Sequence, residues 1–153
     1  MRLEVTRRTD LAARALIALD GAGGRLKAPD LAQRIGTTPG YVTQVVAPLV
    51  SNGWVSSEPG PTGGYALSTG LSDLSVLAVV EAVEGRTDDG RCVLQGGTCG
   101  GHAPCALHDA WAAARRELVD RLAHISIRSV ADGSATPVAV TAPFARPERR
   151  GHG

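Results

Sequence analysis

The feature that most restricts the fold of this 153-residue chain is a glycine- and proline-rich segment at residues 58–64, EPGPTGG. Short apolar patterns that favour β-strands lie on both sides of it, at residues 54–56 and 65–67. Proline and repeated glycine suit turns and weaken strands, so the segment is expected to form the exposed tip of a hairpin. It is not expected to bind phosphate groups as a loop, because it opens no helix behind a strand.

Three short helices are expected before this hairpin, at residues 9–20, 29–36 and 38–53. Each repeats apolar side chains at helical spacing and ends at glycine. The third begins with Thr38 as N-cap, followed by a proline at the first helical position. Pro48, inside this helix, removes one backbone hydrogen bond. Three short helices and a glycine-rich hairpin are the order of a winged helix-turn-helix; the alternative is a small α+β domain without a DNA role.

Further helices are expected after the hairpin. One runs over residues 75–84, and a longer one runs over residues 104–124. The core side of the shorter helix is expected to consist of Leu74, Leu77, Val80 and Val83. The longer helix carries an apolar stripe close to a heptad, made of Leu107, Trp111, Ala114, Leu118 and Leu122. Such a stripe more often packs within one chain than between two. Residues 125–131 could add a helical turn or two, and 133–153 are expected to be disordered.

The only three cysteines, Cys92, Cys99 and Cys105, lie in one glycine-rich segment, and His108 follows them. An odd number of thiols argues against a disulfide framework. Three cysteines and a histidine could hold zinc or an iron–sulfur cluster, but structural zinc sites usually pair ligands about two to four residues apart. The wider gaps here favour an iron–sulfur cluster. Three unliganded thiols, or a ligand role for His102, are the weaker alternatives.

The expected long helix places two of these ligands together. With Pro104 in its first turn, Cys105 and His108 would stand on one face of the helix, three residues apart. Cys105 would also lie at the positive end of the helix dipole, which favours the thiolate. No arrangement typical of catalysis is present: the sequence contains no G-x-S-x-G, Walker A or H-E-x-x-H motif. The chain is therefore not expected to be an enzyme.

Charge is nearly balanced, with a net value of +1, but it is unevenly distributed. Basic side chains predominate in residues 1–66 and acidic ones in 67–109. The basic excess points to a polyanion such as DNA. Residues 1–4 have no apolar region of a signal peptide, and no apolar run is long enough to span a membrane. A cytoplasmic chain without membrane contact is expected.

A winged helix-turn-helix predicts which residues contact double-stranded DNA. The second helix of the pair enters the major groove with its N-terminal residues, which here are Gly40, Tyr41, Thr43 and Gln44. Gln44 can make a bidentate contact with adenine. Phosphate contacts are expected from basic residues that could equally be solvated surface charges: Arg7, Arg8, Lys27 and Arg34. The hairpin tip carries Glu58 and no basic residue, so its contacts are limited to Thr62, Gly63 and Tyr65.

Taken together, these segments resemble the bacterial iron–sulfur winged-helix transcriptional regulators, the family of IscR and NsrR, over residues 1–132. The motifs that carry the resemblance are Met1-Arg2-Leu3, Thr9-Asp10-Leu11-Ala12, Gly40-Tyr41, Gln44-Val45, GPTGGY at 60–65, EAVEG at 81–85, and the set Cys92, Cys99, Cys105 and His108. One departure is Pro59, which stands where IscR-type members have a basic residue that contacts DNA.

The resemblance implies a homodimeric DNA-binding regulator, expected to be a repressor, that binds a pseudo-palindromic operator. A cluster would sense redox state, nitric oxide or iron–sulfur status. IscR-type members hold a [2Fe–2S] cluster with three cysteines and a histidine placed like His108. NsrR-type members use a carboxylate from the first helix of the partner subunit, placed like Asp10, and a [4Fe–4S] cluster would then be favoured. We expect His108 and [2Fe–2S]. A non-DNA iron–sulfur carrier or assembly protein and a zinc-stabilised winged-helix regulator are the alternatives.

The expected fold class is mostly α with a small β-hairpin: a winged helix-turn-helix followed by a long C-terminal dimerisation helix. The expected domains are a DNA-binding domain at 1–85 and a cysteine loop at 86–104. A dimerisation helix and helical turn at 105–132 and a tail at 133–153 complete the chain.

Overall fold

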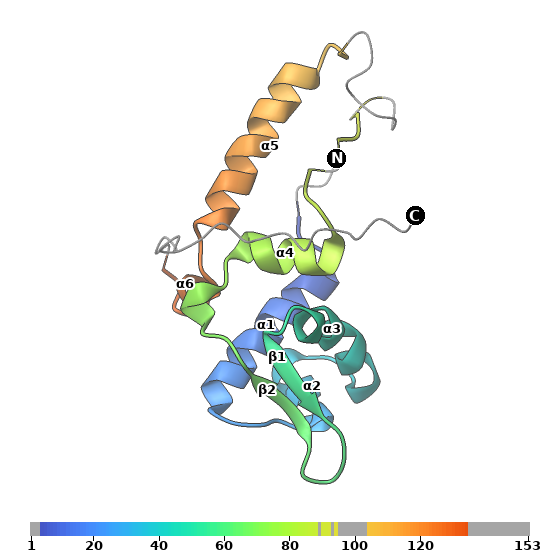
Figure 1. Ribbon diagram of the computed structural model, residues 1–153, viewed down its shortest axis with the longest axis vertical. Coiled ribbons are helices and arrows are strands. Elements are labelled where there is room, and N and C mark those ends of the chain that lie inside the picture. Colours follow the sequence, from blue (N-terminus) through green and yellow to red (C-terminus); the bar gives the residue numbers. More distant parts are fainter. Residues whose placement is uncertain (1–3, 89, 93, 95–103, 135–153) are drawn as a thin grey trace, which may run out of the picture.

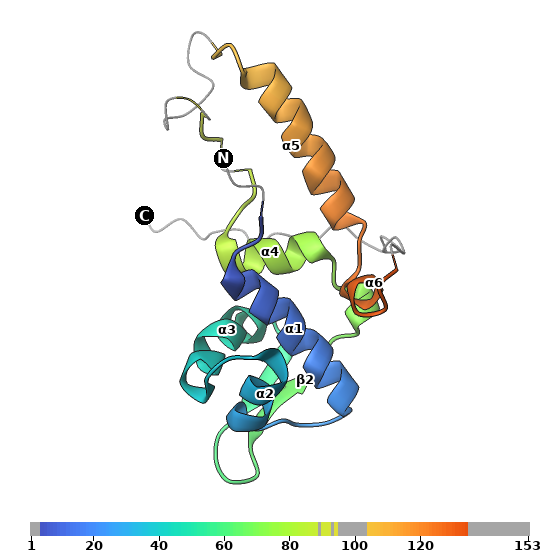
Figure 2. The same ribbon diagram turned by 180° about the vertical axis from the view of Figure 1, so that it is seen from behind.

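The computed structural model of the chain describes residues 4–88, 90–92, 94 and 104–134. Helices predominate among them, with one antiparallel hairpin. In chain order the elements are α1 (Arg7–Ala22), α2 (Ala28–Ile35), α3 (Pro39–Ser51), β1 (Val55–Glu58), β2 (Gly64–Leu67), the 3₁₀ turn η1 (Leu71–Asp73), α4 (Val76–Glu84), α5 (His108–Ala123) and α6 (Ile127–Ala131). This confirms the predicted fold class in its main part, a mostly α chain with a small β-hairpin. Both views show a body from which α5 projects (Figure 1; Figure 2).

The core of the body lies between α1, α2 and α3. Each helix turns one apolar side inward, as the helical spacing predicts. The largest fully buried side chains of these helices are Leu11, Leu16, Leu19, Leu31, Ile35, Val42, Val45, Val46 and Leu49. Both α1 and α2 end at a glycine with left-handed backbone, Gly23 at φ 60° and Gly36 at φ 72°. Glycine adopts this conformation without the steric cost of a Cβ atom. Helix α2 ends where predicted, whereas α1 continues through Gly21 and ends two residues later than predicted.

Two features of α3 bear on its function. Thr38 is the N-cap residue as predicted, but its side chain makes no capping hydrogen bond. Pro39 at the first helical position has no N–H, which would lack a helical partner there in any case. Pro48 lies inside α3. Because helical N–H groups donate to the carbonyl four residues earlier, Pro48 leaves the Gln44 carbonyl without its helical donor.

The wing, which we define as residues 58–64, joins β1 to β2. The strands pair antiparallel, with Val55 opposite Leu67 and Glu58 opposite Gly64, and each is one residue longer than predicted. A Cβ atom at Gly63 would lie 2.1 Å from the Glu58 carbonyl oxygen. One at Gly64, where φ is 131°, would lie 2.3 Å from the Leu26 carbonyl oxygen. Backbone packs directly against backbone at both positions, so the wing requires glycine there.

Helix α4 begins after Ser75, whose hydroxyl accepts the Ala78 amide at 3.1 Å. The prediction of its core side was wrong in part. Leu74 is buried as expected, but Val79 is the buried residue within the helix, while Leu77 and Val80 are only half-buried. Nearly every residue of α4 is apolar, so its sequence has no polar face from which periodicity could identify the inner side.

Helix α5 begins at His108, later than the predicted start at Pro104. Residues 105–107 form a turn in which the His108 amide donates to the Cys105 carbonyl at 2.9 Å. An earlier start would make Ala103 the N-cap, and alanine has no side-chain acceptor for the free amides. Cys105 therefore precedes the helix, and the prediction that it shares a helix face with His108 was wrong.

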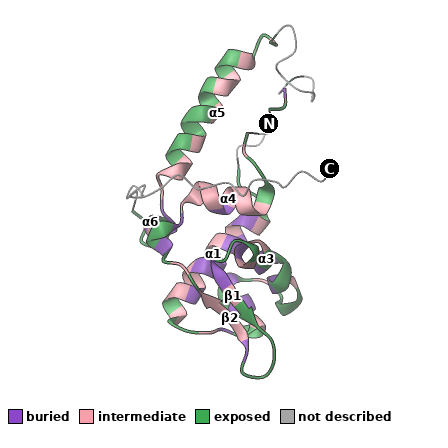
Figure 3. Cartoon of the chain, viewed as in Figure 1, coloured by how far each residue is buried: buried purple, intermediate pink, exposed green. Residues whose placement is uncertain are grey.

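No residue of α5 is buried (Figure 3). Leu118, in the predicted apolar stripe, is 44% exposed. Packing against the residues that the structure describes therefore does not account for the stripe. Helix α6, which follows α5, is attached to the body: the Ile127 amide donates to the Leu74 carbonyl at 2.8 Å, and Arg128 pairs with Asp20 of α1 at 2.9 Å. Among the helices that the structure describes, none has the length and apolar composition needed to cross a membrane.

Candidate metal centre and nucleic-acid interface

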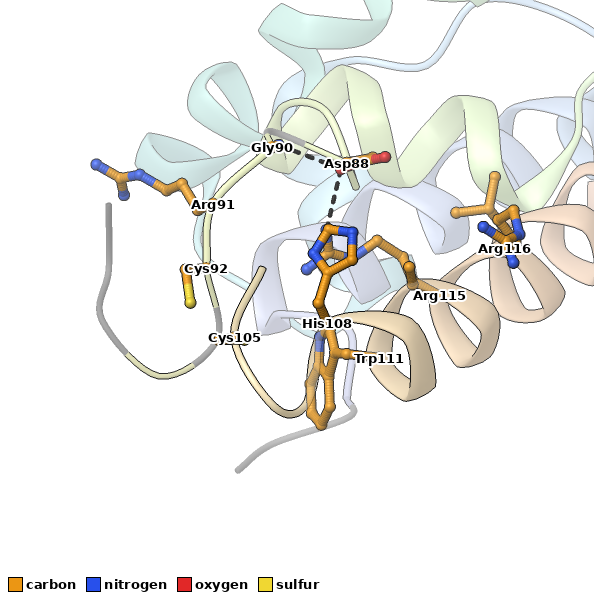
Figure 4. A pocket seen from close by; sticks show the side chains of 11 residues that line it. Asp88, Gly90, Arg91, Cys92, Cys105, His108, Trp111, Arg115 and Arg116 are labelled. Atoms are coloured by element: carbon orange, nitrogen blue, oxygen red, sulfur yellow. Dashed lines mark hydrogen bonds and ion pairs between the residues drawn. The ribbon is translucent and has the colours of Figure 1, made fainter. Parts of the chain in front are cut away.

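A pocket of about 340 Å³ lies between the segment that follows α4 and the first turns of α5. Three of the four predicted ligands line it: Cys92, Cys105 and His108 (Figure 4). The fourth, Cys99, lies outside the described residues. Within the part of the chain that the structure describes, no three His, Cys, Asp or Glu side chains are grouped closely enough for a metal ion.

The donors at this pocket fit an iron–sulfur cluster. Thiolates are the usual ligands of such clusters, and imidazole replaces thiolate at some iron centres. Cys92 is 8% exposed and Cys105 is half-buried. Trp111, Ala112 and Val119 of α5 also line the pocket. Apolar side chains around a metal centre restrict solvent access and help set its redox potential.

An ion pair ties the cysteine segment to α5. Arg115 Nη1 lies 2.9 Å from Asp88 Oδ1, and the Gly90 amide donates to the same oxygen at 3.1 Å (Figure 4). The Gly90 hydrogen bond lowers the pKa of Asp88 more than burial raises it, and Arg115 and Arg86 lower it further. Asp88 therefore stays ionised, and the segment leading to Cys92 is held beside the helix that carries His108.

Asp10, the alternative fourth ligand, is engaged elsewhere. Its Oδ2 lies 2.8 Å from Arg7 Nη1 and its Oδ1 lies 2.9 Å from Arg14 Nε, all within α1. An acidic side chain in the first turn of a helix is also favourable with the helix dipole. Both carboxylate oxygens thus have partners within their own helix, and a role as metal ligand would compete with two ion pairs.

The outer face of α3 carries the predicted base-reading residues. Gly40, Thr43 and Gln44 are exposed, whereas Tyr41 is half-buried and packs against the core. The inward row of valines fixes this orientation, because residues between buried helical positions point outward. The Thr43 hydroxyl lies 3.4 Å from the Tyr65 hydroxyl of β2. The helix therefore presents Thr43 and Gln44 on a face that adjoins the wing.

The predicted phosphate contacts fall into two groups. Lys27 and Arg34 are exposed at the start and near the end of α2. Arg7 and Arg8 make bonds within the chain: Arg7 pairs with Asp10, and Arg8 donates to the Gln44 carbonyl at 2.9 and 3.3 Å. The contact between Arg8 and Gln44 was not predicted from the sequence. The missing N–H of Pro48 was the available signal, because it leaves the Gln44 carbonyl in need of another donor.

The wing has a partner that the sequence interpretation missed. Arg25 Nη2 lies 2.7 Å from Glu58 Oε1, and Arg25 Nη1 donates to the Gly64 carbonyl at 3.1 Å. The Gly63 amide donates to the Gly60 carbonyl at 3.0 Å, which occupies that N–H inside the turn. Thr62 is exposed at the tip. Among the three predicted wing contacts, the Thr62 side chain is thus the most accessible.

Comparison with known proteins identifies the chain. The family model Rrf2, described as iron-dependent transcriptional regulator, matches residues 5–133. The chain belongs to the Rrf2 family. It is 37% identical over 122 residues to the HTH-type transcriptional regulator IscR of Escherichia coli, a match that spans 80% of this chain and 72% of that protein. The predicted resemblance to IscR-type regulators is thereby confirmed.

Solved structures of Rrf2 regulators share the fold. CymR, the global cysteine regulator of B. subtilis, superposes with a TM-score of 0.70 and 19% identity, covering 87% of this chain and 99% of CymR. T. potens IscR superposes with a TM-score of 0.66 and 20% identity, covering 86% and 88% of the two chains. The named relatives are transcriptional regulators and not enzymes, as predicted. This Rrf2 protein is therefore a DNA-binding transcriptional regulator.

Proposed function

We propose that this protein is a homodimeric repressor whose binding to a pseudo-palindromic operator is controlled by an iron–sulfur cluster. The ligands are Cys92, Cys99, Cys105 and His108. The observation that carries the proposal is the pocket that Cys92, Cys105 and His108 all line. The description of the family model as iron-dependent and the similarity to IscR of E. coli support it.

The fourth ligand is His108, and the cluster is [2Fe–2S]. His108 lines the pocket with two of the cysteines, whereas both oxygens of Asp10 are paired with arginines of α1. When bound, the cluster supplies a centre that gains or loses electrons and responds to oxidants, nitric oxide or iron–sulfur supply. The chain contributes the ligands, the apolar wall around Trp111 and the Asp88–Arg115 pair that keeps the cysteine segment against α5.

DNA is bound through α3 and the wing, both of which belong to the DNA-binding domain of residues 1–85. Gln44 reads a base in the major groove, and Thr43 lies beside it on the exposed face. Lys27 and Arg34 contact phosphates, and Arg7, Gly40, Tyr41, Thr62, Gly63 and Tyr65 lie within the same proposed interface. Such a regulator acts in the cytoplasm, where the bacterial operator is.

Dimerisation occurs through α5. No residue of its apolar stripe is buried within the described chain, and Leu118 is 44% exposed. A second copy packed against the stripe would remove Leu118 and its neighbours from water, which is favourable by the hydrophobic effect. Residues 105–132 then form the dimerisation segment, and residues 86–104 form the cluster-binding loop next to it.

One experiment tests the cofactor and DNA binding together. The full chain is purified without air, and its visible absorption, iron, acid-labile sulfide and zinc are measured. The same protein then selects sequences from a random DNA library. We expect a coloured protein with iron and sulfide that enriches a two-fold symmetric site. A colourless protein with zinc would instead indicate a zinc-stabilised regulator. A coloured protein that enriches no site and passes its cluster to an apo-acceptor would indicate a carrier.

A further inference from the structure

The carboxylate of Glu84, in α4, caps the N-terminal end of α1. Glu84 Oε1 accepts the Thr6 amide at 2.9 Å and also the Thr9 hydroxyl. Thr6 is the N-cap of α1, and its own hydroxyl accepts the Thr9 amide at 3.3 Å. Thr9 is only 3% exposed. Free amides at a helix N-terminus need acceptors, and a negative charge is favourable there. Glu84 therefore stabilises the first turn of α1 from a different helix.

The same turn of α1 is also hydrogen-bonded to α3. Arg8, between Thr6 and Thr9, donates two hydrogen bonds to the Gln44 carbonyl. Pro48 has left that carbonyl without a helical donor. The first turn of α1 thus contacts α3, the proposed recognition helix, at Gln44, whose side chain is proposed to read a base.

Glu84 is also the last residue of α4 before the cysteine segment. Gly85 ends the helix with φ 89°, and the Thr87 amide donates back to Glu81 at 3.0 Å. Asp88 then pairs with Arg115 of α5. Residues 85–91 lead directly to Cys92 at the pocket. A change in the cysteine segment therefore acts first on the end of α4, where Glu84 is anchored.

We propose that Glu84 is a positioning residue that couples the cysteine segment to the recognition helix through the first turn of α1. The coupling requires two states. In one, Glu84 caps the first turn of α1 and Arg8 donates to the Gln44 carbonyl; in the other, both contacts are broken. Whatever shifts Glu84 shifts Arg8, because Thr6, Arg8 and Thr9 belong to one helical turn. The inference rests on the proposed function and names the route by which the cluster would regulate operator binding.

The first test compares the operator affinity of the cluster-bound and apo forms, using the site recovered by selection. Fluorescence anisotropy gives the two Kd values. In the wild type they are expected to differ by about fivefold or more. In Glu84→Ala the ratio is expected to fall to about one, with iron and sulfide per chain unchanged. The matched control Glu117→Ala removes an exposed carboxylate of α5, which pairs with Arg121, and keeps the wild-type ratio.

A second pair of variants tests the same contact from α1. Thr9→Val removes the hydroxyl that donates to Glu84 but keeps the side-chain volume. In this variant the ratio of the two operator Kd values is expected to fall to about one, as in Glu84→Ala. Thr9→Ser keeps a hydroxyl and is expected to show the wild-type ratio of Kd values. A cluster-bound Glu84→Ala protein with the wild-type ratio would overturn the coupling and leave the proposed function intact. A wild-type ratio of one would overturn cluster control itself, and the coupling with it.

Hydrogen exchange on the apo protein provides a readout that needs no cluster. Glu84→Ala is expected to speed the exchange of the backbone amides of residues 42–46 in α3 by about tenfold, because the first turn of α1 opens more often. The Glu117→Ala control is expected to exchange like the wild type. Faster exchange confined to α1 and α4, with α3 unchanged, would show that Glu84 only caps a helix and would overturn the coupling.

Discussion

Arg8 donates two hydrogen bonds to the backbone carbonyl of Gln44, at 2.9 and 3.3 Å. In an uninterrupted helix that oxygen would accept the amide of residue 48, but residue 48 is proline. A guanidinium from α1 therefore replaces a donor that α3 lacks. The two bonds fix the position of α3 relative to α1 at Gln44, the residue that faces DNA in the proposed interface.

The Arg8–Gln44 contact predicts a specific non-additivity. Arg8→Ala is expected to lower the free energy of unfolding by about 1–2 kcal/mol. Hydrogen bonds to charged groups usually contribute about 1.5–3 kcal/mol, and solvent exposure reduces the contribution of this pair. In a Pro48→Ala background the same change is expected to cost little, because alanine at position 48 restores the helical donor. Urea unfolding of the apo protein measures all four members of the cycle. Equal losses in both backgrounds would contradict the account.

Gln44→Ala tests base reading. We expect a loss of about 1–3 kcal/mol in binding at the selected operator and little change on random DNA, because only a base contact discriminates between sequences. Anisotropy titrations on both DNAs measure the difference. Gln33→Ala, an exposed glutamine of α2, is the matched control and is expected to bind both DNAs like the wild type. An equal loss on both DNAs would mean that Gln44 does not read a base.

The exposed stripe of α5 predicts the oligomeric state. Leu118→Glu places a charge on the stripe and is expected to give monomers at micromolar concentration, because burying an unpaired carboxylate at an interface is unfavourable. Asp120→Lys changes a charge on the opposite side of the helix and is expected to leave the dimer intact. Sedimentation equilibrium distinguishes the two. A wild-type protein that sediments as a monomer would refute dimerisation through α5.

The two candidate fourth ligands give opposite expectations. His108→Ala is expected to yield a protein with a labile cluster or none, while Asp10→Ala keeps the cluster. The measurement is the visible absorption and iron content of each variant purified without air. The reverse result would assign the ligand to Asp10 of the partner subunit and favour a [4Fe–4S] cluster.

Acid should weaken the contact of Glu84 with α1. Burial alone would raise the pKa of Glu84, but hydrogen bonds from Thr9 and Thr6 outweigh it and hold the pKa below its ordinary value of 4.5. The group therefore stabilises the folded state above its unfolded pKa, and this contribution disappears as pH falls through the lower, folded pKa. We expect stability to fall more steeply with acidification in the wild type than in Glu84→Gln. Urea unfolding at a series of pH values measures it, and parallel curves would contradict it.

Much of the fold could be predicted from local signals. The helices of the body have a clear apolar side and a glycine at or just beyond the end, and the wing has a run of prolines and glycines, so their positions follow from residues close in sequence. The errors occurred where local signals were weak. Helix α4 is apolar on nearly all sides. The proline at position 104 favours a helix start, but the alanine before it has no side chain that could cap the helix.

The candidate site was predictable only as a set of ligands. The spacing of Cys92, Cys105 and His108 suggested a shared centre, and all three line one pocket. The contacts of Glu84 with α1, Arg25 with Glu58 and Asp88 with Arg115 join side chains far apart in sequence. Any exposed charge has many possible partners, so only the folded arrangement identifies such pairs.

The Arg25–Glu58 pair has a consequence for how the wing meets DNA. The pair is internally neutral, so the wing brings no net charge to the phosphate backbone and displaces few of the counterions condensed on the duplex. Shape and hydrogen bonding determine its contribution, which ionic strength hardly changes. The salt dependence of operator binding then rests on the basic side chains at α1 and α2, without the contribution that a basic wing would add.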